Sequence, residues 1–159
     1  MKSYRVTKYK PSLRDHNGNY TDVEDWTSFS DIGENIHGEL FTYDKYVITE
    51  NKYIETIFYC MKDLNIESLI IKDLEIYQDE DELKNLTDNS VIDENHLESV
   101  IKLILREKIW AKLETDDLKI HFGYDYYMYI ITKTTNSELL GEISSLGLYA
   151  EEFESPYDE

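Results

Sequence analysis

The feature that most constrains the fold is an alternating run of apolar and polar residues between positions 118 and 132. Every second position in its middle is apolar: Ile120, Phe122, Tyr124, Tyr126, Met128 and Ile130. In a β-strand this spacing places all six side chains on one face of a sheet. The run is long for one strand, and Gly123 is the position where a β-bulge is expected. A turn at residues 115–117 joins it to an apolar stretch at 109–114, so these two strands are predicted to pair antiparallel.

Three other stretches repeat apolar residues with the 3.6-residue period of a helix. They cover residues 43–64, residues 94–107 and a shorter stretch that begins at Asn136 or Ser137. Thr42 and Asp93 precede the first two helices as expected N-caps. Gly147 is expected to end the third helix in a left-handed conformation.

Strands are also predicted at residues 3–9, 68–77 and 148–153. The order of elements then predicts an α+β fold, with a mostly antiparallel twisted sheet of about five strands and about three helices packed on it. A length of 159 residues suits one domain, so residues 1–159 are predicted to form a single acidic unit. Residues 155–159 follow the last strand and are expected to be a flexible tail.

The net charge of −18 arises from 34 acidic residues against 16 basic ones. Such a chain repels phosphates and anionic membranes, so neither nucleic acid nor a membrane is an expected partner. It attracts basic proteins, and self-repulsion favours a monomer when free. Residues 1–14 hold Lys and Arg but no acid, whereas acids gather at 79–98 and 134–159. Acidity that only maintains solubility is the alternative interpretation.

The chain begins without an apolar signal-peptide core and has one cysteine, Cys60, which lies at helical spacing among apolar residues. These features predict a cytoplasmic protein and a Cys60 that packs in the core. The four histidines have no partner at metal-ligand spacing, and the six glycines form no phosphate loop. No metal or other cofactor is therefore expected.

Two patterns near residue 123 suggest chemistry. His121 and Asp125 are four residues apart and would share a strand face, where a histidine–carboxylate pair can act as a general base. No Ser or Cys nucleophile stands in a strained turn nearby, and a solvated surface pair is the alternative. Asp125, Tyr127 and Tyr129 would form an exposed binding patch if no helix covered their face. A cross-strand aromatic ladder is the other interpretation of these tyrosines.

Acidic loops beside rigid tyrosines combine electrostatic steering with interface anchoring. On this basis the sequence predicts nine partner-binding residues: Asp79, Glu80, Asp81, Glu82, Asp116, Asp117, Asp125, Tyr127 and Tyr129.

Four collinear segments carry a resemblance to a known family: YRVTKYKPSLRD at 4–15, DWTSFSDIG at 25–33, LILREKIWAKLE at 103–114 and HFGYDYYMYI at 121–130. They resemble the immunity proteins, or antitoxins, encoded beside LXG polymorphic toxins in Gram-positive bacteria. The resemblance implies a cytosolic protein that binds the toxic domain of a secreted effector and neutralises it stoichiometrically, without catalysis. Toxins of such pairs are often nucleases, whose basic surfaces would complement this chain. No catalytic residue is carried over.

Two other functions remain open at this point. An acidic regulator that mimics nucleic acid would sequester a DNA-binding protein, and it requires acids spaced like phosphates along one face. A small hydrolase would use His121 and Asp125, and it requires a cleft around His121.

Overall fold

Three α-helices form in the part of the chain that the structure describes, and each has ends set by local side chains. The computed structural model describes residues 1–17, 19, 25–78, 80–133 and 137–159. The helices are α1 (Tyr43–Asp63), α2 (Glu94–Leu105) and α3 (Ser137–Ser145). Within the described residues, none of the helices has the length and apolarity that crossing a membrane requires.

The expected helix caps are confirmed. The Thr42 side chain accepts a hydrogen bond from the backbone N–H of Lys45, and Asp93 accepts one from that of His96. At the end of α3, the Gly147 N–H donates to Ser144 and the Leu148 N–H donates to Ile143. This pair of bonds, with Gly147 at φ +85°, is a Schellman motif. Asn136, the other possible cap of α3, lies outside the described residues.

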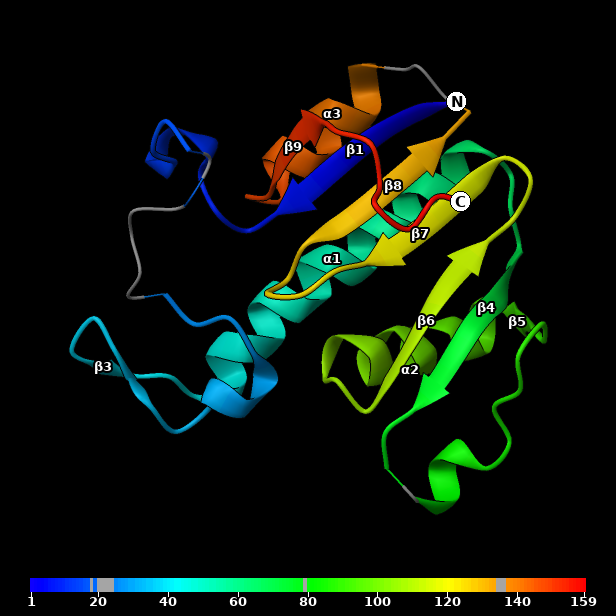
Figure 1. Cartoon of the computed structure of the whole chain (residues 1–159), viewed down its shortest axis with the longest axis horizontal. Helices are drawn as coiled ribbons and strands as arrows, with labels where there is room; N and C mark the ends of the chain where they lie inside the picture. Colours follow the sequence, from blue (N-terminus) through cyan, green and yellow to red (C-terminus); the bar gives the residue numbers. More distant parts are fainter. Residues whose placement is uncertain (18, 20–24, 79, 134–136) are drawn as a thin grey trace.

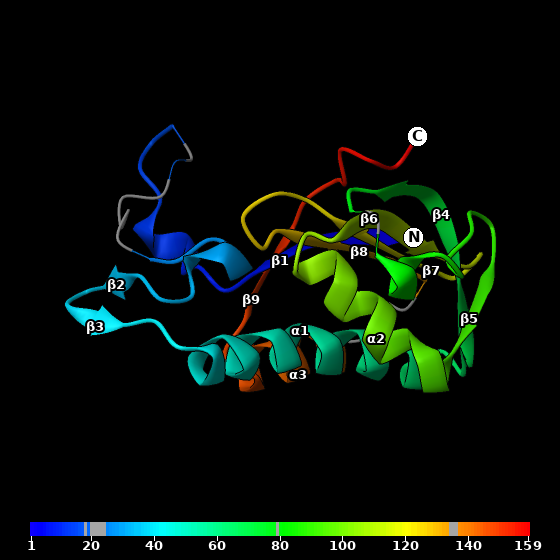
Figure 2. The ribbon, with the colours of Figure 1, turned by 90° about the horizontal axis from the view of Figure 1, so that it is seen from below.

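The helices pack on one face of a seven-stranded sheet in which every neighbouring pair of strands is antiparallel (Figures 1 and 2). The strand order is β5-β4-β6-β7-β8-β1-β9. The strands are β1 (Lys2–Thr7), β4 (Ser68–Ile76), β5 (Val91–Asp93), β6 (Ile109–Glu114), β7 (Leu118–Phe122), β8 (Met128–Thr132) and β9 (Tyr149–Glu152). The α+β class and the antiparallel sheet are confirmed, but the sheet has seven strands where about five were expected.

Part of this difference lies in residues 118–132, which form a hairpin and not one bulged strand. β7 ends at Phe122, and the Gly123 N–H donates to the Tyr127 carbonyl at 2.7 Å to close the turn. Asp125 and Tyr126 take left-handed backbone conformations there, with φ of +57° and +65°. Because β7 and β8 pair with each other, their backbone N–H and C=O groups form hydrogen bonds that a single long strand would have to make with other strands. The other additional strand, β5, is a three-residue edge strand beside β4.

Short elements complete the chain between β1 and α1. They are η1 (Pro11–Leu13), η2 (Phe29–Asp31) and a ribbon of β2 (Asn35–Ile36) with β3 (Glu39–Leu40); a third 3-10 turn, η3 (Asp81–Leu83), follows β4. Ser28 caps η2 in a capping box with Asp31. Trp26 stacks on Phe41 with ring centroids 4.6 Å apart, which fastens this region to the core.

The core between helices and sheet contains a buried aromatic and ionic cluster. Tyr126 packs edge-on against Trp26 and Tyr53 with ring centroids 5.0 and 5.6 Å away. Glu50 of α1 is fully buried and pairs with Arg106, which directly follows α2. Cys60 is buried as expected, and burial raises the pKa of its thiol to about 12. Tertiary packing thus joins α1, α2 and the β7–β8 turn.

The face of the sheet that points away from the helices is called the open face here. Residues 153–158, called the C-terminal segment, cross this face (Figure 2). Ser155 is buried, and Lys119 of β7 forms an ion pair with Asp158. The expectation of a flexible tail at 155–159 is therefore corrected: the segment packs on the sheet because its serine and tyrosine find partners there.

Candidate functional site

The open face carries an aromatic cluster that the C-terminal segment partly covers. Tyr157 lies across three strands, with its ring centroid 5.5 Å from Trp110, 6.4 Å from His121 and 6.0 Å from Tyr129. Phe153 covers Tyr129 from the other side, with centroids 6.1 Å apart. Tyr129 is consequently only 6% exposed.

Beside this cluster the sheet opens into a cleft between β6 and β7. The two strands pair at Leu113–Ile120 and Glu114–Lys119 and then diverge. Across the gap, the indole N–H of Trp110 donates to the Phe122 carbonyl at 2.8 Å. This side-chain hydrogen bond takes the place of the backbone hydrogen bonds between β6 and β7, and a wedge-shaped space remains between the two strands. This cleft has a volume of about 620 Å³, within the range of about 300–1,000 Å³ typical of ligand pockets.

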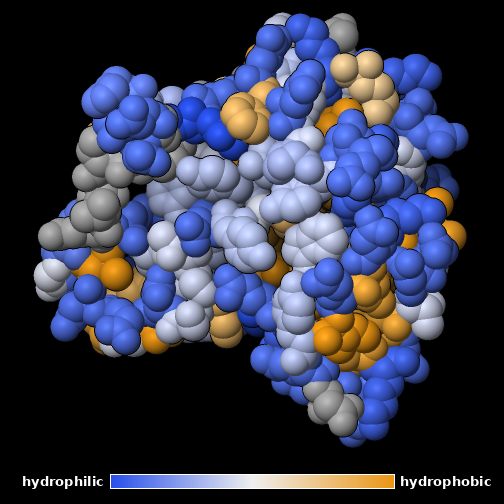
Figure 3. Space-filling model, viewed as in Figure 1, coloured by the Kyte–Doolittle hydropathy of each residue, from blue (hydrophilic) through white to orange (hydrophobic). Residues whose placement is uncertain are grey.

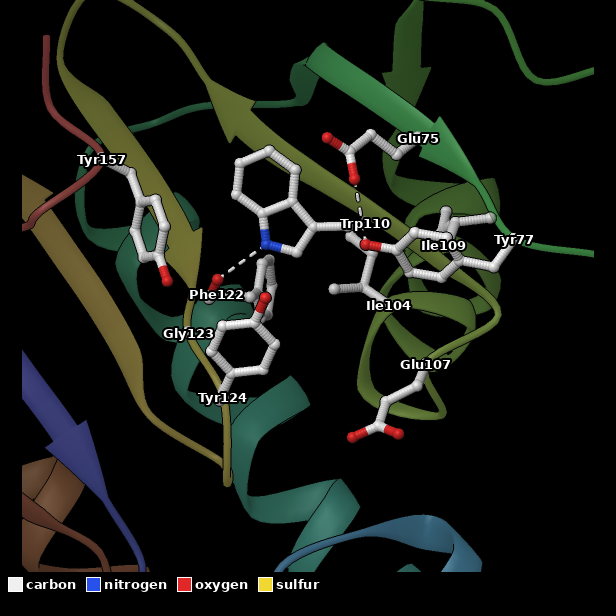
Figure 4. A pocket seen from close by; sticks show the side chains of 10 residues that line it. All are labelled: Glu75, Tyr77, Ile104, Glu107, Ile109, Trp110, Phe122, Gly123, Tyr124 and Tyr157. Atoms are coloured by element: carbon white, nitrogen blue, oxygen red, sulfur yellow. Dashed lines mark hydrogen bonds between the residues drawn. The ribbon is translucent and has the colours of Figure 1, made fainter.

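Aromatic and acidic side chains line the cleft (Figure 4). They are Glu75, Tyr77, Glu107, Trp110, Phe122, Tyr124 and Tyr157, together with aliphatic residues of α2 and β6. Tyr124 and Tyr77 are 86% and 56% exposed. Figure 3 shows hydrophobic residues gathered beside hydrophilic ones on the face of the molecule seen in Figure 1. Rigid aromatics at the rim of a hollow are typical of interaction surfaces.

The two carboxylates of the cleft carry net negative charge. Glu75 accepts a hydrogen bond from the Tyr77 hydroxyl at 3.1 Å, and Glu107 accepts one from Ser28 at 3.3 Å. Within the described residues, neither forms an ion pair with Lys or Arg. Partial burial and the neighbouring Glu75 raise the pKa of Tyr77 to about 12, so its hydroxyl stays neutral and donates at physiological pH.

Three hydrogen-bonded polar side chains join the C-terminal segment to the sheet. His121 Nδ1 is 2.7 Å from Ser155 Oγ, and His121 Nε2 is 2.7 Å from Glu114 Oε1. These residue types match a hydrolytic triad, but His121 has no exposed surface and Ser155 is 8% exposed. Ser155 Oγ also accepts the backbone N–H of Tyr157, and neither Ser155 nor His121 lines the cleft. The hydrogen bonds among Ser155, His121 and Glu114 hold the C-terminal segment on the sheet.

The predicted pairing of His121 with Asp125 is wrong. β7 ends before Asp125, which lies exposed in the following turn, whereas His121 points into the covered open face. The Ser155–His121 contact was missed because 34 residues separate the two. No local spacing in the sequence signals it.

The pH dependence of stability should reveal His121. Burial lowers the pKa of His121 below its ordinary 6.5, outweighing the opposite effects of Glu114 and Asp158, while Lys112 lowers it further. The unfolded chain therefore binds the proton more readily, and this site's stabilisation is complete above about pH 6.5 and declines as pH falls from there. His121→Gln should show a shallower loss of unfolding free energy between about pH 7 and 5, measured by urea denaturation. Parallel pH profiles for the two proteins would contradict this.

The predicted binding residues that the structure describes are spread over separate loops and strand β8. Glu80 pairs with Lys108 at 3.1 Å and Asp81 pairs with Lys84 at 2.7 Å. Asp79 and the side chain of Glu82 lie outside the described part of the chain. The 116–117 turn precedes β7 and the 123–127 turn follows it, so they occupy opposite ends of that strand.

The tyrosine patch is also rearranged. Asp125 is exposed and Tyr127 is half-buried, but Tyr129 is buried under Phe153 and Tyr157, so the three do not form an exposed patch. Tyr124, expected to share one face of the sheet with Tyr126, is exposed in the structure and lines the cleft. Asp117 pairs with Lys133 at 3.0 Å, whereas Asp116 is exposed. A binding role for these residues remains a prediction.

No protein-family model, curated protein or solved structure matches this chain.

Proposed function

We propose that this protein is an immunity protein that binds a basic toxin domain in the cytoplasm and neutralises it by stoichiometric, non-catalytic inhibition. The observation that carries the proposal is the cleft between β6 and β7, with five aromatic side chains and two carboxylates free of Lys and Arg partners among the described residues. On a chain with a net charge of −18, such a cleft suits a cationic protein surface. The resemblance to the immunity proteins of LXG toxins supports the same class of partner.

Binding accounts for the site better than catalysis does. The Ser155–His121–Glu114 chain is the arrangement closest to a hydrolytic one, yet burial keeps substrate from its serine. The cleft itself offers carboxylates and tyrosines but no Ser, Thr or Cys side chain, and the described residues hold no metal-ligating cluster. Rigid aromatics at its rim provide contact area at low entropic cost, which is what protein interfaces use.

The toxin class follows from electrostatics. A nuclease presents cations to phosphates, so an acidic protein is its natural complement, and opposite fields accelerate association. We propose a nuclease domain as the partner and a monomer as the free state of this chain.

Co-expression tests the proposal directly. This chain and the C-terminal domain of an adjacent long gene would be produced together, with pull-down and growth rescue as readouts. A one-to-one complex that restores growth supports immunity. A toxic neighbour that this chain neither binds nor rescues overturns it, and retention of DNA-binding proteins from a low-salt lysate would then favour the nucleic-acid mimic.

Reversing the four acids at 79–82 to lysine should slow association with the toxin roughly tenfold at low salt and flatten its salt dependence, because steering by that loop is lost. Stopped-flow association across a salt series is the measurement. The matched control reverses Glu55, Glu67, Glu94 and Glu142, which line a groove in the helical layer and give the same net charge. Equal slowing by both variants would show that total charge, and not the loop's position, sets the rate.

A further inference from the structure

We infer that the cleft between β6 and β7 is the binding site for an arginine side chain presented by the partner protein. This inference rests on the proposed function, because it names the chemical group by which a basic partner would be held.

The walls of the cleft are suited to a flat cation. Trp110 is fixed in place by its hydrogen bond to the Phe122 carbonyl and by the Tyr157 ring 5.5 Å away. Tyr124 and Tyr77 are largely exposed at the rim. A guanidinium stacks favourably on aromatic faces through cation–π attraction, and Trp is the best of these partners.

The charge of the cleft selects a cation. Glu75 and Glu107 approach it from β4 and from the turn after α2 (Figure 4), and no Lys, Arg or His lines it within the described residues. Each carboxylate has one hydrogen bond to a hydroxyl, from Tyr77 or Ser28, which leaves further lone pairs for a ligand. An apolar side chain would leave both charges unpaired at the mouth of a hollow.

Arginine fits this arrangement better than lysine. Its planar fork of five N–H donors can bind a carboxylate while its flat face stacks on a ring, and it is less strongly hydrated than an ammonium group. Arginine is also enriched, with Trp and Tyr, among the residues that dominate binding energy in interfaces. The open, wedge-shaped cleft of about 620 Å³ has room for the side chain and part of its flanking backbone.

An NMR titration tests the inference without the partner. The probe is acetyl-Gly-Arg-Gly amide, and its control is the same peptide with citrulline, which has the shape of arginine without its charge. The two tryptophans give two indole N–H signals: Trp110 lines the cleft, and Trp26 lies in the core against Phe41 and serves as an internal reference. We expect a saturable shift of the Trp110 signal with the arginine peptide and a much smaller one with citrulline.

Variants assign the shift to the carboxylates. Both Glu75 and Glu107 are exposed, so Glu75→Gln/Glu107→Gln should stay folded and weaken peptide binding roughly fivefold. The control variant Glu55→Gln/Glu142→Gln, in the helical layer, removes the same amount of charge and should leave the affinity for the peptide unchanged. Equal shifts for arginine and citrulline, equal movement of Trp26, or equal weakening by both double variants would overturn the inference.

The toxin complex separates this inference from the proposed function. If the toxin binds the wild type and the Glu75→Gln/Glu107→Gln variant with equal affinity, the arginine site is wrong while immunity stands. If the peptide binds as expected but no toxin domain binds the wild type, the cleft recognises arginine and the immunity function is wrong.

Discussion

Replacing Arg106 with methionine should lower the free energy of unfolding by about 3–5 kcal/mol, because it leaves a buried carboxylate without its counter-ion. Glu50 is fully buried in α1, and Arg106 Nε and Nη2 donate to its two oxygens at 2.9 and 2.8 Å. These bonds to Glu50 raise the pKa of Arg106, so the guanidinium stays charged. Methionine keeps much of the apolar contact with the Phe29 ring, 5.2 Å from the guanidinium, and removes the charge.

Urea denaturation of the wild type and Arg106→Met gives the measurement, with Lys102→Met as the matched control. Lys102 lies four residues earlier, within α2, and pairs with Glu98 at 2.9 Å, but both side chains are substantially exposed. Such a pair contributes about 0.3–0.5 kcal/mol. The double variant Glu50→Leu/Arg106→Met should recover much of the loss, because no unpaired buried charge remains. A similar small loss for Arg106→Met and Lys102→Met would show that the buried pair is not needed.

Replacing Tyr126 with alanine should cost about 3–5 kcal/mol, as removal of a large buried aromatic does. Its side chain is 6% exposed and packs among the rings of Trp26, Tyr46 and Tyr53. Its hydroxyl lies 2.9 Å from the Leu105 carbonyl and 2.6 Å from the Tyr46 hydroxyl. Tyr126→Phe keeps the ring contacts and should lose about 1–3 kcal/mol, since buried polar partners are left unsatisfied.

Thermal and urea unfolding would measure both variants of Tyr126, and Tyr124→Ala provides the control. Tyr124 is two positions earlier in the same turn and is 86% exposed, so its removal should change stability by no more than about 0.5 kcal/mol. If the two alanine variants were equally destabilised, the two tyrosines would share a face, as they would in one continuous strand.

Helix boundaries and charge could be predicted from the sequence because they depend on neighbouring residues. Thr42 and Asp93 cap helices by bonding to a backbone N–H three residues ahead, and Gly147 ends one by its own backbone freedom. The antiparallel pairing of residues 109–114 with the strand after them followed from the tight turn between them. The expectation of an acidic domain that binds a partner came from the composition of the chain, which is also read directly from the sequence.

The candidate site could not be predicted because tertiary structure creates it. Apolar residues alternate with a period of two both in one long strand and in a hairpin. The alternation therefore did not reveal that the chain turns between Gly123 and Tyr127. Nor did it reveal which of Tyr124 and Tyr126 faces solvent. The cleft exists only because β6 and β7 diverge beyond Ile120.

Local patterns thus determined the positions of the described helices and of most of the strands, and composition determined the strong negative charge of this chain. Only the tertiary structure decided the strand order, the buried Glu50–Arg106 pair and the placement of Ser155 on His121. The physical reason is distance along the chain: caps and periodicity act over a few residues, whereas these contacts join groups 34 and 56 residues apart. Their formation depends on how the helices and the C-terminal segment pack on opposite faces of the sheet.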